Sequence, residues 1–258
     1  MNIAFAITSQ QGERSHNQDR VGHRLTDRNA CFVVCDGVAG LPGGEQAAHI
    51  ACDTLLETLA TTDRFSADDS RQAIEKSDRA IREAQQINPK LQRMSTTLAA
   101  LFIDREQQLA WWAHAGDSRI YHFRRGYLKQ VTRDHSLAQR MKDAGYENTG
   151  INSNLLYNAL GAETMREASY SDVVALEDGD AFLVCSDGFW LHLAVAEMEQ
   201  ALRMVNSCEE WLTLMQQAVD RTRKNDNLSA VAIWIGSPQE TTLLQSLADS
   251  ARLLPPRG

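Results

Sequence analysis

Four aspartates in this sequence lie where apolar runs end, a placement that suits carboxylates used in chemistry. Asp36, Asp117 and Asp187 follow the runs CFVVC, LAWWAHAG and AFLVCS, and Asp226 stands just before LSAVAIWI. A single Asp-Gly pair is typical of a turn, because both residues favour turns for local reasons. Four such carboxylates indicate more than turns, since rigid strands can direct the residues at their ends toward one shared point.

Carboxylates that converge repel one another, and the repulsion needs a compensating positive charge. No lysine or arginine lies beside Asp36, Asp187 and Asp226 in a regular pattern. A hard divalent cation would supply the charge, and an all-oxygen ligand set suits Mg²⁺ or Mn²⁺ better than zinc, which prefers Cys and His. The sequence therefore favours a Mg²⁺ or Mn²⁺ site, provided that the four strand ends meet.

The segment Arg14-Ser-His-Asn-Gln-Asp19 adds an arginine and a further carboxylate. A guanidinium beside a cation site suits the bidentate binding of a phosphate dianion. The alternative reading of Arg14, taken alone, is an ordinary surface arginine.

Composition restricts the class of protein. The chain has 258 residues, of which 43% are hydrophobic and 23% charged, with a formal net charge of -8. An acidic chain is unsuited to general binding of nucleic acid or of anionic lipid, since both reward a basic surface. No apolar stretch approaches the roughly 18 residues of a membrane span, and the first ten residues lack the basic start of a signal peptide. We therefore expect a soluble, cytoplasmic protein.

Five cysteines are present, and two of them, Cys31 and Cys35, share one apolar run. In a strand they would stand about 13 Å apart, too far for a mutual disulfide. We expect all five to be reduced, mostly buried thiols. The chain also lacks the C-x5-R run of cysteine-dependent phosphatases.

The hydrophobic pattern mixes strands and helices without strict alternation, which predicts an α+β domain with largely antiparallel sheets. Strands are expected at residues 3–7, 30–35, 96–103, 108–114, 119–123, 127–131, 173–176, 181–185 and 228–235. Helices are expected at residues 45–59, from an N-cap at Ser66, and at 134–144, 197–204 and 209–221. Residues 146–154 are predicted to be a loop. A capping box at Ser237 opens an amphipathic helix, so the chain divides into 1–236 and a C-terminal helix and tail, 237–258, packed on the same domain.

Seven short motifs, in this order, resemble those of the PPM family of metal-dependent Ser/Thr protein phosphatases, in its compact, stand-alone bacterial form. Each motif is weak alone, whereas seven in the family's order are specific, and they span roughly residues 3 to 235. The motifs are Arg14–Asp19, Asp36–Gly40, Ser95–Thr97, Ala115–Arg119, Thr132–Ser136, Ser186–Gly188 and Asp226–Ser229.

The resemblance implies a sandwich of two antiparallel β-sheets flanked by helices on both faces, with two Mn²⁺ or Mg²⁺ ions, and a third in some members, at one end. By motif position, Asp36 would bridge the two metals, Gly37 would contribute its carbonyl, and Asp187 and Asp226 would be the other direct ligands. Three further roles follow the same correspondence: Asp19 would act through water, Arg14 would hold the phosphate, and Asp117 would bind the third, weaker metal.

Two positions depart from the family pattern. Gln18 stands where glutamate is common, which removes one negative charge near the metals. Val38 stands where eukaryotic relatives carry a histidine proposed as the general acid, so the proton donor is not identified. His16 and His135 lie in the motifs, but a lone histidine is more often structural.

The resemblance implies hydrolysis of phosphoserine and phosphothreonine in proteins by a metal-activated bridging hydroxide, without a covalent intermediate. The implied partners are phosphorylated proteins, with a eukaryotic-like Ser/Thr kinase and its targets as the system reversed, and we expect a monomer. A kinase that controls secretion is one hypothesis. The alternatives are a non-catalytic phosphoprotein-binding module on the same fold, and a phosphatase of anti-sigma-type regulators, whose relatives usually carry sensor domains.

Overall fold

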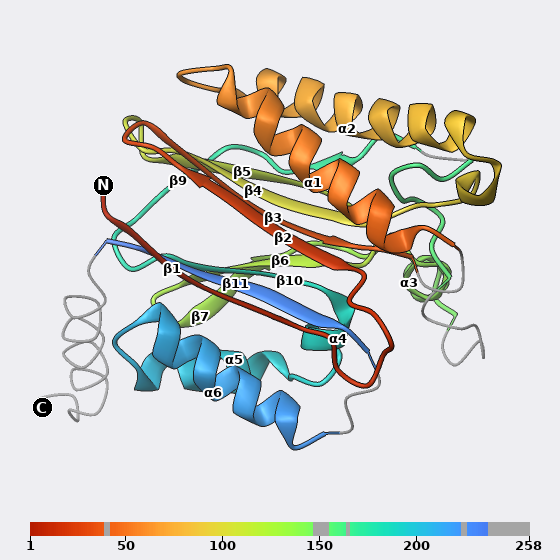
Figure 1. Cartoon of the computed structure of the whole chain (residues 1–258). Helices are drawn as coiled ribbons and strands as arrows, with labels where there is room; N and C mark the ends of the chain where they lie inside the picture. The colour runs from red at the N-terminus through yellow and green to blue at the C-terminus, as the bar shows by residue number, and fades with distance from the viewer. Residues whose placement is uncertain (39–41, 147–154, 164–165, 223–225, 237–258) are drawn as a thin grey trace, which may run out of the picture.

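Two antiparallel sheets stacked face to face form the centre of the protein, and helices cover both outer faces (Figure 1). The computed structural model describes residues 1–38, 42–146, 155–163, 166–222 and 226–236. One sheet has the strand order β1-β11-β10-β6-β7. The other has the order β2-β3-β4-β5-β8, with β9 also paired to β5. The layers confirm the predicted sandwich with helices on both faces.

The strands and helices have the following bounds. The strands are β1 (Ile3–Gln10), β2 (Asp19–Leu25), β3 (Asn29–Asp36), β4 (Leu98–Asp104), β5 (Leu109–Ala115), β6 (Arg119–Arg124), β7 (Tyr127–Val131), β8 (Ser169–Tyr170), β9 (Val174–Ala175), β10 (Ala181–Cys185) and β11 (Leu228–Ile235). The helices are α1 (Gly44–Ala60), α2 (Ala67–Ile87), α3 (Leu137–Asp143), α4 (Asp187–Trp190), α5 (Val195–Met204) and α6 (Cys208–Asp220), with a 3-10 turn at Pro89–Leu91.

Three apolar layers hold the sandwich together, and β3 shows how one strand serves two of them. Its side chains alternate, so that Phe32 and Val34 lie in the core between the sheets while Cys31, Val33 and Cys35 lie in the core under α1 and α2. The third layer joins the other sheet to α5 and α6, around the fully buried Trp211. A strand buried on both faces is thus fixed in register, because a slip of one residue would exchange its two faces.

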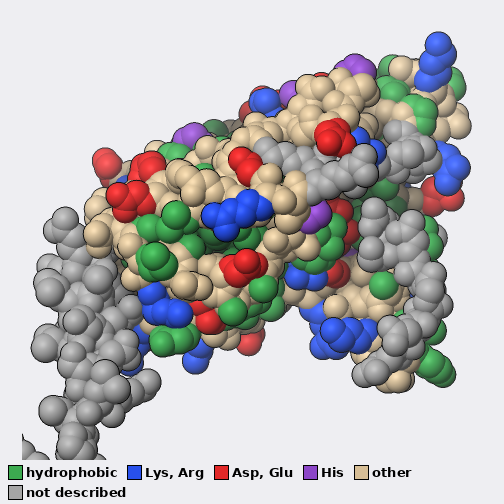
Figure 2. Space-filling model, turned by 90° about the horizontal axis from the view of Figure 1, so that it is seen from below, with side chains coloured by type: hydrophobic (Ala, Val, Ile, Leu, Met, Phe, Trp, Pro, Cys, Tyr) green, Lys and Arg blue, Asp and Glu red, His purple; other side chains and the backbone are tan. Residues whose placement is uncertain are grey.

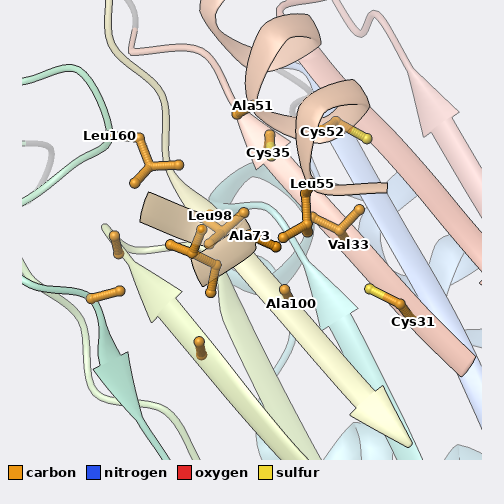
Figure 3. Packing of buried hydrophobic residues seen from close by; sticks show 14 of the residues in the cluster. Cys31, Val33, Cys35, Ala51, Cys52, Leu55, Ala73, Leu98, Ala100 and Leu160 are labelled. Carbon is orange, nitrogen blue, oxygen red and sulfur yellow. The ribbon is translucent and has the colours of Figure 1, made fainter. Parts of the chain in front are cut away.

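The helix pair α1 and α2 covers the sheet that contains β3 (Figure 1). Ser66 accepts a hydrogen bond from the backbone N–H of Asp69, whose carboxylate accepts one from Ser66 in return, as in a capping box. Beneath the helices, Leu55 of α1 and Ala73 of α2 pack over Val33 of β3 (Figure 3). All five cysteines are free and buried, as predicted.

The structure corrects one predicted helix and adds a strand that the sequence analysis did not predict. The helix expected at 134–144 begins only at Leu137, because Ser136 is its N-cap and Asp134 is instead paired with Arg119. Strand β2 was not predicted, since its sequence DRVGHRL lacks a clear apolar alternation and most of its side chains are partly exposed at the edge of the sheet. Its pairing with β3, which only the tertiary structure reveals, places Asp19 opposite Asp36.

Some predictions fall outside the described residues. The C-terminal helix at 237–258 does so entirely, and the division of the chain at residue 236 therefore stays a prediction; the loop at 146–154 is described only at Tyr146. Within the described part of the chain, no helix has both the length and the apolar character needed to cross a membrane. Seen from below, acidic and basic side chains are interspersed among hydrophobic ones rather than gathered by sign (Figure 2).

The packing of α1 on the sheet predicts the effect of truncating Leu55, whose side chain is fully buried. We expect Leu55→Ala to lower the free energy of unfolding by about 2–5 kcal/mol, because it removes buried methyl groups and leaves a cavity. Urea unfolding measures the loss. Leu25→Ala is the control, since Leu25 is 39% exposed and its truncation should cost less than about 1 kcal/mol. Equal losses in the two variants would contradict this account of the core.

Candidate active site

Asp19 and Asp36 face each other across the β2–β3 pair, at the end of the sandwich where the other predicted site residues also lie. Residues directly opposed in antiparallel strands have Cα atoms about 4.5–5.5 Å apart. The backbone of Asp36 is held on both sides. Its N–H donates to Thr97 Oγ1 at 2.9 Å, and its carbonyl accepts from Thr96 Oγ1 at 2.9 Å and from the Thr97 N–H at 2.8 Å. The S-T-T motif therefore fixes the position of Asp36.

Gly37 follows Asp36 at a point where the chain touches the start of α1. A Cβ atom on Gly37 would lie 2.3 Å from the carbonyl carbon of Gly44, a distance that no side chain can adopt. The Gly37 N–H donates to the Gln18 carbonyl at 3.1 Å. Glycine is thus required here by close backbone approach.

Asp187 and Asp226 come from the other sheet, at the end of β10 and the start of β11. The Ser186 N–H donates to the Ser229 carbonyl at 3.0 Å, which ties the two segments together. A Cβ on Gly188 would lie 2.1 Å from the carbonyl oxygen of Asn227, so only glycine allows this approach. The glycine that follows each of Asp36 and Asp187 therefore serves close packing rather than a turn alone.

Asp19 links the two sheets. Its Oδ2 accepts a hydrogen bond from Ser186 Oγ at 2.8 Å, whereas its Oδ1 is buried and has no hydrogen-bond partner. Burial raises the pKa of the Asp19 carboxyl to about 6, against the lowering effect of bonds to Ser229 and Ser186. A buried carboxylate oxygen without a partner is costly, and it fits a cation or a water on a cation as its missing partner.

The carboxylates also act on one another. Asp36 as a whole residue is half-buried, but its carboxyl group is enclosed by protein. This burial raises the pKa of the carboxyl well above its ordinary value. The charges of Asp19 and Asp187, and to a smaller extent those of Asp117 and Asp226, raise this pKa further. Burial likewise raises the pKa of Asp187, with Asp226 adding to the effect. Four other carboxylates thus lie close enough for their charges to act on Asp36.

The described residues do not contain a ready-made cluster of three or more His, Cys, Asp or Glu side chains arranged to hold a metal ion. The donor set nevertheless fits hard divalent cations. The gathered donors are carboxylate oxygens, one of them buried without a partner, and like charges at this density call for a positive counter-charge. Asp36, Asp187 and Asp226, with the Gly37 carbonyl, are the direct ligands that the motifs imply.

Arg14 lies beside these carboxylates, with its Nη2 2.7 Å from Asp226 Oδ2. The loop that carries it is pinned by Asn227, whose Oδ1 accepts from the Gln18 N–H at 2.8 Å and whose Nδ2 donates to the carbonyls of Gln11 and His16 at 2.7 and 2.9 Å. The side chain next to Asp226 thus sets the path of the loop that presents Arg14.

Asp117 lies on the same rim, after β5, and is 7% exposed. Burial raises its pKa to about 8, and the charges of Asp187 and Asp134 add to the effect. The Asp117 carbonyl accepts a hydrogen bond from Trp190 Nε1 at 2.9 Å. The guanidinium of Arg119 stacks on the Trp190 ring, with Cζ 3.3 Å from the ring centre. Arg119 in turn forms a two-pronged ion pair with Asp134, at 2.7 and 2.8 Å.

The two histidines of the motifs differ in environment. His135 is buried, its Nε2 bonds to Ser169 Oγ at 2.8 Å, and burial lowers its pKa to about 4, so that it is neutral near pH 7 and has the structural role expected of a lone histidine. His16 is exposed beside Arg14, on the wall of a cleft of about 640 Å³.

Sequence reasoning did not assign roles to Ser186, Asn227, Ser229 and Trp190. The first three stand inside the S-D-G and D-N-x-S motifs, so the signal was present, but their bonds to other loops became visible only in the fold. Trp190 lies beyond the motifs, and nothing in the sequence connects it to Asp117.

The chain resembles known proteins in sequence and in structure. Residues 8–231 match the family model described as Protein phosphatase 2C. The chain is 26% identical over 249 residues to the serine/threonine phosphatase stp of Listeria innocua, with 92% of this chain and 95% of that protein covered. It is 30% identical over 251 residues to the serine/threonine protein phosphatase PstP of Mycobacterium tuberculosis, with 89% of this chain and 44% of that longer protein covered.

A solved structure shows the same architecture. The catalytic domain of PstP in complex with 2 manganese ions superposes with a TM-score of 0.79 at 25% identity, covering 91% of this chain and 99% of that domain. The family model spans most of the chain and includes Asp19, Asp36, Asp187 and Asp226. On these grounds, the chain belongs to the protein phosphatase 2C family of serine/threonine phosphatases.

Proposed function

We propose that this chain hydrolyses phosphoserine and phosphothreonine in phosphoproteins, at the rim where Asp19, Asp36, Asp187 and Asp226 meet, with two Mn²⁺ or Mg²⁺ ions as cofactors. The observation that carries the proposal is the mutual effect of these carboxylates on the pKa of Asp36, beside an arginine suited to phosphate. When bound, such cations lower the pKa of water and neutralise phosphate charge.

The residues of the chain divide the remaining work. Asp36, Gly37, Asp187 and Asp226 hold the cations, and Asp19 acts through water, with Ser186 fixing one of its oxygens. Arg14 orients the phosphoryl group, which requires its guanidinium to share or exchange its contact with Asp226. Asp117, on the Trp190 side of the rim, is the ligand of a third, weaker ion.

The cysteines do not provide a nucleophile. Cys35 comes directly before Asp36, and Cys185 directly before Ser186, on the strands that lead to the site. Burial raises the pKa of both thiols far above neutrality. The proposed reaction is a direct attack by a water-derived oxygen on phosphorus, which breaks the bond to the serine or threonine oxygen and requires no covalent enzyme intermediate.

The proposal extends to the setting of the reaction. The bacterial Ser/Thr phosphatases that resemble this chain support a role that reverses a Ser/Thr kinase. The free, buried cysteines support a location in the cytoplasm, where thiols stay reduced. A monomer completes the proposed setting. Turnover of a generic aryl phosphate that depends on Mn²⁺ tests the proposal against a non-catalytic phosphoprotein-binding module.

The first prediction for the site concerns Asp187. Asp187→Asn should lower kcat by at least about a hundredfold at saturating Mn²⁺, because it removes a charged oxygen ligand while keeping the shape of the side chain. Steady-state kinetics on a phosphothreonine peptide gives the rate, and circular dichroism checks the fold. Asp172→Asn, at an exposed position, is the control and should have the wild-type rate. A near-normal rate for Asp187→Asn would remove this residue from the site.

Arg14→Ala should mainly raise KM for a phosphopeptide, by about tenfold or more, with a smaller loss in kcat. A charge-assisted contact to phosphate that is similar before and during reaction contributes mostly to binding. Arg79→Ala, on the exposed face of α2, removes an equal charge away from the site and should leave KM unchanged. If KM is the same in the Arg14 variant and in wild type, Arg14 does not bind the phosphate.

Raised carboxyl pKa values predict how stability depends on pH after treatment with EDTA. The folded protein keeps protons on Asp19 and Asp117 up to about pH 6 and 8, whereas the unfolded chain releases them near pH 4, so the free energy of unfolding should fall as pH rises through this window. Added Mn²⁺ should raise Tm more at pH 8 than at pH 5, because protons compete with it for the carboxylates.

Thermal scans at several pH values measure both effects. Asp117→Asn should reduce the fall in stability between pH 6 and 8, because burial raises the pKa of its carboxyl to about 8. A Tm that is constant between pH 5 and 8, or an equal gain from Mn²⁺ at both ends, would show that the carboxylates do not form one electrostatic unit.

A further inference from the structure

A cleft of about 640 Å³ opens directly beside Arg14, between the N-terminal loop and the start of α1. The cleft adjoins the carboxylate site, because Arg14 lines the cleft and its Nη2 also lies 2.7 Å from Asp226 Oδ2. The residues that line it are Arg14, Ser15, His16 and Gln18 from the loop, and Gly43, Glu45, Gln46 and His49 from the start of α1.

The charge in this cleft is set by Glu45. Apart from the two histidines, Arg14 and Glu45 carry the only formal charges among the described residues that line it. Arg14 is paired with Asp226 and, under the proposed function, also with the phosphoryl group. Glu45 is exposed in the first turn of α1 and forms no ion pair with any described residue. The charge left for a ligand to meet is therefore negative.

We propose that this cleft binds a basic side chain, arginine or lysine, that flanks the phosphorylated residue of the substrate, with the Glu45 carboxylate as its counter-charge. The inference rests on the proposed function, because it takes the phosphoryl group to lie at Arg14. Extended chain advances roughly 3.3–3.6 Å per residue, so a residue within about three positions of the phosphorylated one reaches a cleft that adjoins Arg14.

The rest of the molecule supports a cationic substrate segment. The chain has a formal net charge of -8, and a net negative protein attracts basic segments at a distance. Polar groups of Gln18, Gln46 and Ser15 line the same cleft and offer acceptors to the donors of a guanidinium or ammonium group. Glu45 thereby becomes a specificity-determining residue of the phosphatase.

The test uses phosphothreonine peptides that are identical except for one position, scanned over three residues on either side of the phosphothreonine, with arginine, glutamine or glutamate there. At one or two positions, wild type should have a kcat/KM about three- to tenfold higher for arginine than for glutamine, the range of a partly exposed ion pair. Glu45→Gln should bring this ratio close to one, and Glu45→Lys should favour the glutamate peptide.

Glu57→Gln is the matched control. Glu57 is also exposed on α1, about 18 Å further along the helix, and its loss should leave the ratio at the wild-type value. Glu45 also stands where a negative charge favours the helix dipole, so Tm is recorded for every variant, and Glu45→Asp, which keeps the charge, should retain part of the preference.

Three outcomes would overturn the inference. The first is an equal kcat/KM for all peptides in wild type. The second is an arginine-to-glutamine ratio of kcat/KM that is unchanged in Glu45→Gln, and a lower Tm of that variant would then show that Glu45 only stabilises the helix. In both cases the phosphatase activity stands. Absence of turnover of every peptide with Mn²⁺ would contradict the proposed function and this inference with it.

Discussion

The repulsion among five carboxylates held at one end of the sandwich is the constraint on which the site depends. Asp36 is affected by all four of the others, and burial removes the water that would weaken the effect. A protein must use its folding free energy to hold such groups together. Here that energy comes from three apolar layers that run along the strands and reach the residues next to the charged rim.

The groups that resist this repulsion are mostly neutral. Thr97 Oγ1 accepts from the Asp36 N–H and Asn227 Oδ1 accepts from the Gln18 N–H, while Ser186 Oγ donates to the Asp19 carboxylate. Neutral hydrogen-bonding groups can fix the position of a carboxylate without neutralising it, which leaves the charge for a cation. Arg14, in contrast, brings a full positive charge, and it comes from a loop rather than a strand, which allows it to exchange one anionic partner for another.

The sandwich explains why residues distant in sequence share the rim. Strands β2 and β3 supply Asp19 and Asp36 from one sheet, and β10 and β11 lead to Asp187 and Asp226 in the other. The bond from Ser186 to Asp19 crosses from sheet to sheet. Stacking of the two sheets is therefore a condition for the site as well as for stability, and the two glycines at close backbone contacts, Gly37 and Gly188, set how near the loops can come.

The sequence by itself determined the fold class, the family motifs and the candidate aspartates, because these depend on local pattern: apolar runs, turn residues and fixed spacing. Only the tertiary structure decided that β2 pairs with β3, that Asn227 pins the loop of Arg14, and that Trp190 contacts Asp117. Each of these contacts joins two segments that are distant in sequence, and no local pattern in either segment indicates the other. Contacts of this kind depend on how the sheets stack and which backbones approach, and these are properties of the whole chain rather than of any window in it.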